Sequence, residues 1–80
     1  MQEKKIKLNN MKDAGIFVRA AEKCDFDIDV SYNHVFVDGK SILGVLGLDL
    51  TRVLSVKYQG YNADFEEVLE SFSADQKSAA

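Results

Sequence analysis

The sequence predicts an α+β fold in which an open, mostly antiparallel sheet is covered on one face by helices. Residues 26–32 alternate apolar and polar side chains, and Val35 and Val37 resume the two-residue spacing after a short break, which is the pattern of a β-hairpin. Residues 14–24 and 61–72 instead repeat apolar side chains every three or four positions, as amphipathic helices do. With the other alternating runs, the order becomes β-α-β-β-α-β-α, and the hairpin within it favours an antiparallel sheet.

The length and composition indicate one domain over residues 1–73. The chain has 80 residues, of which 46% are hydrophobic and 29% charged, and it lacks proline, which is ordinary for a packed globule. This length leaves no room for a second domain. Residues 74–80 are all small or polar, so we expect a disordered C-terminal tail there.

Charge and cysteine content exclude several classes of partner. The net charge of -3 and the pI of about 5.0 argue against nucleic acid, and the short lysine cluster over residues 4–7 includes an apolar residue. No apolar run approaches the roughly 20 residues of a membrane span, and no signal-peptide core is present, so we expect a cytoplasmic protein. Cys24 is the sole cysteine, which excludes an internal disulfide and a thiolate metal site, and no cofactor is expected.

The first strand and helix are predicted from the segment KKIKLNN. Its apolar residues alternate with lysines, which indicates a half-buried strand. Asn9 or Asn10 can accept a hydrogen bond from a free backbone N–H as an N-cap, and Asp13 adds the negative charge that the helix dipole favours there. A helix of about three turns is therefore expected to follow.

The hairpin is predicted to turn at Asn33 and His34. A two-residue turn of the preferred kind needs positive φ at both central positions, which is unfavourable for a residue other than glycine. We therefore expect mild backbone strain at His34, which stands where glycine is more usual.

The rest of the chain is predicted to form a helix, a strand and a last helix. Ser41 is the natural N-cap of a helix over residues 41–49. The alternating run 54–58 predicts the fourth strand, and the final helix follows over residues 61–72.

The helix over residues 41–49 has more apolar side chains than one buried stripe needs. Val45 and Leu48 lie three residues apart and suffice to pack on the sheet. A second apolar group lies on the side that this pair does not use, and an exposed group of this kind marks a partner surface; it consists of Ile42, Leu43 and Leu46.

Several stretches of the chain resemble HPr, the small phosphocarrier of the bacterial sugar phosphotransferase system, and its regulatory paralogues. They are the run DFDIDVSYN, the segment KSILGVLGL, where the family typically has K-S-I-M-G-x-M-x-L, and the closing helix after Gly60. The resemblance covers roughly residues 4 to 72. It implies the HPr-like open-faced sandwich, a four-stranded antiparallel sheet covered on one face by three helices.

The chain departs from this family at the position that carries phosphate. The family has a phosphorylatable histidine followed by Ala-Arg-Pro at the start of the first helix. Alignment back from the motif IFV places Asn10 at the histidine, Lys12 at the arginine and Asp13 at the proline, and the preceding loop is shorter. Asparagine cannot form a phosphoramidate. The only histidine, His34, lies in the hairpin turn, away from the helix N-terminus that would stabilise the anion.

Ser41 matches the serine that a dedicated kinase phosphorylates in Gram-positive members of the family. A phosphate there would change the adjoining apolar surface, and Lys40 would lie beside it and partly neutralise it. The resemblance implies protein partners: enzymes of the phosphotransferase system, a serine kinase or a transcription regulator.

The leading hypothesis is an HPr-like regulatory module that cannot carry phosphate on histidine. It is expected to bind proteins through a surface gated at Ser41 and formed by Lys40, Ile42, Leu43 and Leu46. The first alternative is a working phosphocarrier of the same system. The second is an acyl-carrier-like protein, since DGKSI loosely resembles the Asp-Ser-Leu to which a phosphopantetheine arm attaches, although such carriers are all-helical.

An enzyme is not expected from this sequence. The chain has one histidine, one cysteine and no glycine-rich phosphate loop. Asp27 and Asp29 project from one face of a strand, where a solvated position explains them.

Overall fold

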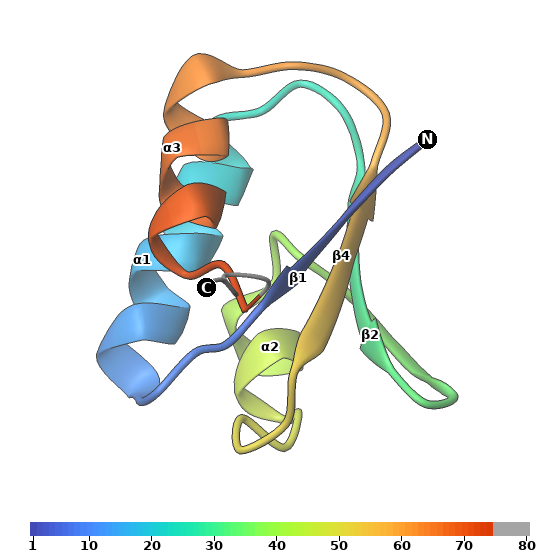
Figure 1. Cartoon of the computed structure of the whole chain (residues 1–80), viewed down its shortest axis with the longest axis vertical. Helices are drawn as coiled ribbons and strands as arrows, with labels where there is room; N and C mark the ends of the chain where they lie inside the picture. The colour runs from blue at the N-terminus through green and yellow to red at the C-terminus, as the bar shows by residue number, and fades with distance from the viewer. Residues whose placement is uncertain (75–80) are drawn as a thin grey trace, which may run out of the picture.

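The computed structural model describes residues 1–74, which contain four strands and three helices in the predicted order (Figure 1). The elements are β1 (Gln2–Ile6), α1 (Met11–Glu22), β2 (Ile28–Tyr32), β3 (Val35–Asp38), α2 (Ile42–Leu46), β4 (Leu54–Tyr58) and α3 (Ala63–Ser71). The prediction of an α+β open-faced sandwich is confirmed. The tail predicted over residues 74–80 lies outside the described residues, apart from Ala74.

Strand β4 joins the two halves of the sheet. The strand order is β1-β4-β2-β3, and all neighbouring strands are antiparallel. Tyr58 of β4 lies opposite Gln2 on one side and Ile28 on the other. The hairpin of β2 and β3 extends the sheet from there, as the alternating pattern predicted.

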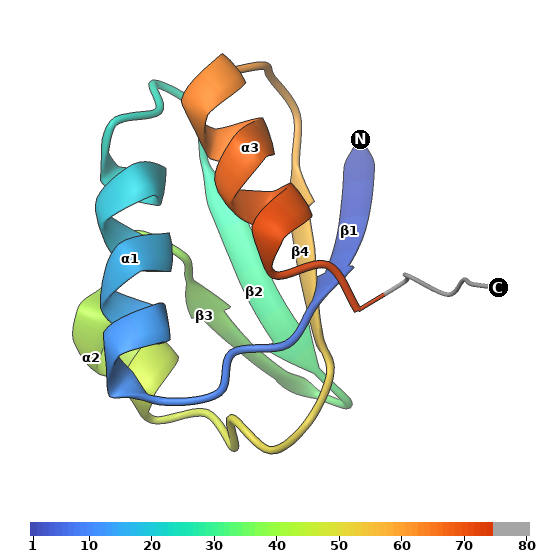
Figure 2. The same ribbon diagram turned by 60° about the vertical axis from the view of Figure 1, so that its left-hand side comes forward.

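The helices lie on one face of the sheet, as the two views together show (Figure 2). Alternate residues of β4 point into this layer, because successive side chains of a strand face opposite sides. Leu54, Val56 and Tyr58 are therefore buried, whereas Ser55 and Lys57 lie on the uncovered face. The largest fully buried side chains come from both layers: Tyr58, Phe17, Phe65, Ile6, Leu8, Ile28, Leu54, Val30, Val45 and Val56.

The two edges of the sheet differ. The outer edge of β1 is covered by residues that follow α3: the N–H of Lys7 donates to the carbonyl of Phe72 at 2.9 Å, and that of Ala74 donates to the carbonyl of Lys5 at 2.9 Å. The fold therefore reaches Ala74, one residue beyond the predicted domain boundary. Within residues 1–74 the outer edge of β3 pairs with no strand.

The prediction of backbone strain at His34 is wrong. Asn33 has a φ of 51° and is the one residue other than glycine with positive φ among residues 1–74. Asparagine enters this region more readily than most residues, because its short polar side chain can hydrogen-bond locally. The turn thus places its unusual dihedral on the residue that tolerates it, and His34 is simply exposed beside it.

Helix α2 is shorter than the predicted range of residues 41–49. It ends at Leu46, and the N–H of Gly47 donates to the carbonyls of Leu43 and Gly44 at 3.1 and 3.2 Å. Two glycines in so short a segment weaken the helix, because each is less favourable than alanine by about 1 kcal/mol. Leu48 is nevertheless buried, since the turn after α2 still directs it into the core.

An aromatic cluster connects β4 with α1 and α3. The ring centroids of Tyr58 and Phe65 are 5.3 Å apart in an edge-to-face contact, and Phe26 stacks on Tyr58 at 5.8 Å. Phe17 of α1 lies 5.8 Å from Phe65 between ring centroids. The hydroxyl of Tyr58 donates to Oε2 of Glu66 at 2.6 Å. Burial, followed by this hydrogen bond, raises the pKa of Tyr58 well above its usual range.

Substitution of Gly60 by alanine is expected to lower the free energy of unfolding by about 1–3 kcal/mol through overpacking. The added methyl would lie 2.3 Å from Cδ2 of Phe26, so the ring would have to leave the aromatic cluster. Gly15→Ala is the matched control, because nothing lies within 4 Å of its new methyl and alanine favours the helix. Urea unfolding of both variants checks this packing, and a Gly60→Ala protein as stable as Gly15→Ala would contradict it.

Candidate functional site

The start of α1 is closed by side chains of the chain itself. Asn10 is the N-cap, and its Oδ1 accepts the N–H of Asp13 at 2.9 Å. Oδ2 of Asp13 in turn accepts the N–H of Asn9 at 3.0 Å. This reciprocal arrangement, related to the capping box, satisfies two backbone donors. The prediction of an N-cap at Asn9 or Asn10 is confirmed, with Asn10 in that role.

The charges at this helix end favour the carboxylate already present over a further anion. Asp13 lies in the first turn, where the helix dipole stabilises a negative charge. A phosphate at the same end would meet the like charge of this carboxylate. Asn10 and Lys12 are both exposed, and residues 9–13 contain no histidine.

Ser41 is half-buried at the start of α2, where it is the N-cap as predicted. Its Oγ accepts the N–H of Gly44 at 3.1 Å, and its carbonyl accepts the N–H of Val45 at 2.9 Å. A methyl at Gly44 would lie 3.3 Å from Oγ of Ser41 and 3.3 Å from Cβ of Val37. Glycine at this position therefore keeps the surroundings of the hydroxyl uncrowded.

The ammonium group of Lys40 has a partner other than Ser41. Its Nζ donates to the carbonyl of Cys24 at 3.0 Å, just beyond the end of α1, where a cation is favoured by the helix dipole. This contact ties the β3–α2 connection to α1. The place of Lys40 beside a phosphate on Ser41 stays a prediction. Cys24 is buried, and burial raises the pKa of its thiol.

The apolar residues predicted as a partner surface differ in exposure. Leu43 is 81% exposed and Ile42 is 39% exposed, whereas Leu46 is partly buried and packs against the core. A shallow cavity of about 230 Å³ lies between α1 and α2, lined by Gly15, Val18, Arg19, Glu22 and Ile42. The sequence did not predict that α1 contributes to the surface beside Ile42. The one indication was Gly15, a glycine within an amphipathic helix.

His34 does not approach the start of α1. It is exposed in the turn between β2 and β3. In both views the tip of this hairpin and the start of α1 lie at opposite sides of the molecule (Figures 1 and 2). A phosphate on His34 would therefore gain nothing from the N-terminus of that helix.

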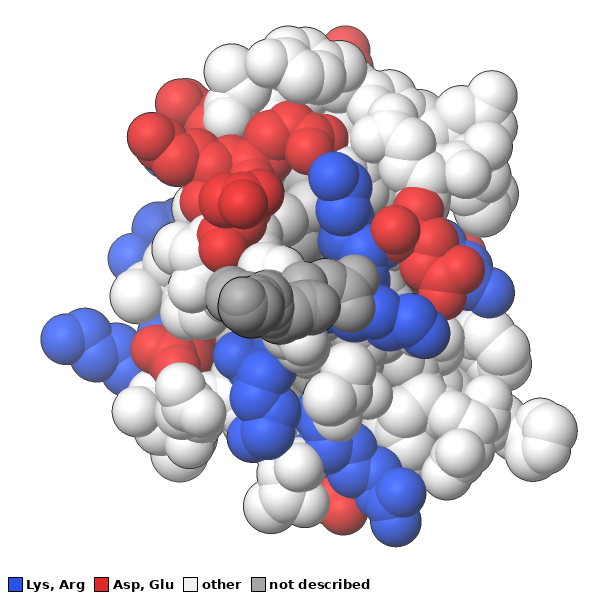
Figure 3. All heavy atoms as spheres, in the orientation of Figure 1, with Lys and Arg blue, Asp and Glu red and all other residues white. Residues whose placement is uncertain are grey.

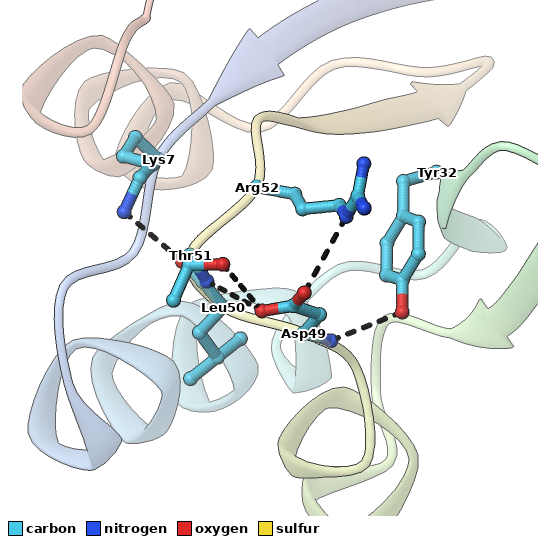
Figure 4. A network of polar contacts seen from close by, with 6 residues as sticks. All are labelled: Lys7, Tyr32, Asp49, Leu50, Thr51 and Arg52. Atoms are coloured by element: carbon cyan, nitrogen blue, oxygen red, sulfur yellow. Dashed lines mark hydrogen bonds and ion pairs between the residues drawn. The ribbon is translucent and has the colours of Figure 1, made fainter.

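A polar network holds the connection between α2 and β4 (Figure 4). Asp49 accepts hydrogen bonds from Oγ1 and the N–H of Thr51 at 2.6 and 3.1 Å and from Nε of Arg52 at 3.4 Å, and these bonds lower the pKa of Asp49. The hydroxyl of Tyr32 accepts the N–H of Asp49 at 3.3 Å, and Arg52 lies over the Tyr32 ring. Nζ of Lys7 donates to a carbonyl of the same loop at 3.0 Å. The network joins the loop to β2 and to the segment before α1.

Acidic side chains gather over α3 (Figure 3). The α3 sequence contains no lysine or arginine and carries Asp64, Glu66, Glu67 and Glu70. Asp64, Glu67 and Glu70 are exposed, as expected for the solvated side of a helix, whereas Glu66 is partly buried. Glu66 accepts the Tyr58 hydroxyl and lies 3.8 Å from Nζ of Lys4, so it links α3 to the sheet.

The fold and this site define a small α+β domain with a serine-capped helix beside exposed apolar side chains. The family model for the PTS HPr component phosphorylation site matches residues 9–75, so the chain belongs to the HPr family of the phosphotransferase system. Proteins of this family are phosphocarriers rather than enzymes and interact with other proteins of that system. The predicted HPr resemblance is confirmed. The equivalence of Asn10 with the family's histidine stays a prediction.

Two solved structures are similar over most of their length. HPr-C-His from Thermoanaerobacter tengcongensis has a TM-score of 0.70 and 25% identity, with 89% of each chain covered. The phosphocarrier protein HPr from Bacillus anthracis str. Ames has a TM-score of 0.63 and 24% identity, covering 91% of this chain and 93% of that chain.

The four-stranded sheet of residues 1–74 excludes the acyl-carrier alternative, because such carriers are all-helical. Over the same residues, no helix is both long enough and apolar enough to cross a membrane. The described part of the chain also holds no group of three His, Cys, Asp or Glu side chains that could bind a metal ion.

Substitution of Asn10 by alanine is expected to lower the free energy of unfolding by about 1 kcal/mol, because the N–H of Asp13 loses its acceptor. Asn10→Ser is the control, since serine caps helices about as well as asparagine. Urea unfolding compares the three proteins. An alanine variant as stable as the wild type would show that the capping role is wrong.

Proposed function

We propose that this HPr-family protein does not carry phosphate on histidine and acts as a regulatory, protein-binding member of the phosphotransferase system. The observation that carries the proposal is the closed start of α1. The Asn10 amide, at the position that the resemblance gives to the phosphorylatable histidine, caps the helix through Asp13 at 2.9 Å. The carboxylate of Asp13 occupies the end where a phosphate would be stabilised.

The binding surface of this proposal is the exposed side of α2. Leu43 and Ile42 supply its apolar contact area, with Leu46 beneath them at the boundary of the core. An 81% exposed leucine contributes little to the fold, and with the neighbouring exposed Ile42 it forms an apolar group that a partner could cover. Lys40 lies at the margin of this surface. Its aliphatic stem can contact a partner while its ammonium group remains hydrogen-bonded to the carbonyl of Cys24.

Ser41 is proposed as the regulated position of this surface. A kinase would transfer a phosphoryl group from ATP to Oγ of Ser41, with release of the hydroxyl proton. The first turn of α2 contains no acidic residue, in contrast to Asp13 at α1, and the carboxylate of Asp38 before this helix accepts the N–H of Lys40 at 2.9 Å. The phosphate would lie beside Ile42 and Leu43 and thus select between partners that prefer an apolar or an anionic surface.

A working phosphocarrier is the second candidate function. The family match favours it, since the matching description is that of the phosphorylation site and the match spans Asn10. It would require phosphate on a residue other than Asn10, and His34 is the only histidine of the chain.

Incubation with phosphoenolpyruvate and the first enzyme of the phosphotransferase system is expected to leave the protein unmodified, because residues 9–13 contain no histidine. Mass spectrometry at neutral pH makes the measurement, with the Bacillus anthracis HPr as a positive control for the assay. An acid-labile phosphoryl adduct would support the phosphocarrier instead. Loss of that adduct in His34→Gln would assign it to the hairpin.

The Leu43→Lys variant is expected to lower the kcat/KM for phosphorylation of Ser41 by a serine kinase of this system by about tenfold, since central apolar contacts dominate binding. Tyr61→Lys is the matched control, because Tyr61 is 74% exposed but lies outside α2. Incorporation of labelled phosphate from ATP measures both, and Ser41→Ala should incorporate none. Equal losses in the two lysine variants, or incorporation into Ser41→Ala, would contradict the proposed surface.

A further inference from the structure

The outer edge of β3 is an exposed strand edge with apolar side chains. Residues 72–74 cover the opposite edge of the sheet, but nothing within residues 1–74 pairs with this one. Val35 is 42% exposed and Phe36 is 64% exposed. An edge of this kind presents unpaired N–H and C=O groups and is a template for another strand.

The register of the hairpin fixes which backbone groups of β3 face outward. The N–H of Gly39 donates to the carbonyl of Ile28 at 2.7 Å, and hydrogen-bonded pairs of an antiparallel ladder recur at two-residue steps. Phe36 and Asp38 occupy the intervening positions, so their N–H groups and the carbonyl of Phe36 point away from β2. The carbonyl of Asp38 accepts the N–H of Ser41 at 3.0 Å.

We propose that a second copy of this chain pairs with this edge, β3 against β3 and antiparallel, about a two-fold axis at Phe36. Each Phe36 N–H would donate to the Phe36 carbonyl of the other copy. Each Asp38 N–H would donate to the His34 carbonyl of the other copy. The two sheets would then form one continuous sheet through an isologous interface.

The side chains in this register complement one another. Phe36 lies on the uncovered face of the sheet and would contact Phe36 of the second copy. On the helix-covered face, Val35 would lie opposite Val37 of the second copy. Cross-strand aromatic and β-branched pairs of this kind stabilise antiparallel sheets. The two exposed apolar residues of β3 would thus both be covered.

Charge complementarity at the ends of the strand supports the same register. His34 would lie opposite Asp38 of the second copy, and its ring N–H can donate to the carboxylate. Within its own chain Asp38 lies directly opposite Asp29, an unfavourable pairing of like charges. Oδ1 of Asp38 accepts the N–H of Lys40 at 2.9 Å, while Oδ2 makes no hydrogen bond within residues 1–74.

Other registers lose this match. A slip of one residue would turn the side chains of one copy to the opposite face. A slip of two residues would place Phe36 opposite His34 or Asp38 and would leave fewer backbone hydrogen bonds. Because a short strand buries less than a standard interface, we expect a weak, reversible dimer with a Kd on the order of 100 μM.

Sedimentation velocity of the full chain from about 10 μM to about 1 mM tests the pairing, since a dimer of this affinity forms within that range. The wild type is expected to dimerise, and Phe36→Lys to stay monomeric because two ammonium groups would meet at the axis. Val35→Lys is a second variant of the same edge in case Phe36→Lys fails to fold. Leu43→Lys is the control, equally charged and on the exposed side of α2, and should dimerise like the wild type.

Charge substitutions at the strand ends test the register. His34→Asp should weaken the dimer by about tenfold, since it places two pairs of carboxylates opposite each other. The double variant His34→Asp, Asp38→His exchanges the partners and should restore most of the affinity. A wild type that is monomeric at the highest concentration would overturn the proposal. A dimer that is lost in Leu43→Lys but kept in Phe36→Lys would also overturn it. So would a dimer whose affinity is the same in His34→Asp and in the double variant as in the wild type.

Discussion

The pairing of β4 with β1 on one side and β2 on the other is the constraint on which the rest of the fold depends. A strand bonded along both edges has its register fixed twice, and a slip of one residue would turn Leu54, Val56 and Tyr58 to solvent. These three side chains form part of the sheet surface on which the helices pack. Tyr58 contacts Phe65 of α3, and Phe65 contacts Phe17 of α1, so the register of β4 also helps to position these two helices.

The two helix starts use the same capping chemistry with different consequences. At α1 and at α2 a side-chain oxygen accepts a backbone N–H three residues ahead. At α1 the first turn also contains Asp13, whose carboxylate completes the cap and leaves an incoming anion in contact with like charge. At α2 the first turn has no acid, and the carboxylate of Asp38 binds the N–H of Lys40 rather than the helix start, so of these two positions the hydroxyl of Ser41 is better suited to a phosphate. Because exposed apolar side chains lie beside Ser41, a phosphate there would change which partners this surface can bind.

Most of the fold was predictable, because short-range patterns specify it. Alternation over residues 26–37 and the caps at Asn10 and Ser41 each involve residues that are close in the chain. Most of the features that local patterns did not indicate concern contacts between distant residues. The bond from Lys40 to Cys24 depends on how β3 leads into α2, and no local pattern indicates it. The partial burial of Leu46 and the early end of α2 depend on packing against the core, which competes with helical spacing. The choice of Asn33 over His34 for positive φ required a knowledge of the turn type.

The closure of the β1 edge by residues 72–74 has a consequence for the order in which the protein folds. Strand β1 is synthesised first, yet its partners on both sides come from residues 54–58 and 72–74. Contacts so far apart in the chain close slowly, because a long loop must be ordered before they form. During synthesis the hairpin of β2 and β3 is therefore complete before the segments that pair with β1 have been made. The outer edge of β1 can therefore be covered only after all four strands and α3 have been made.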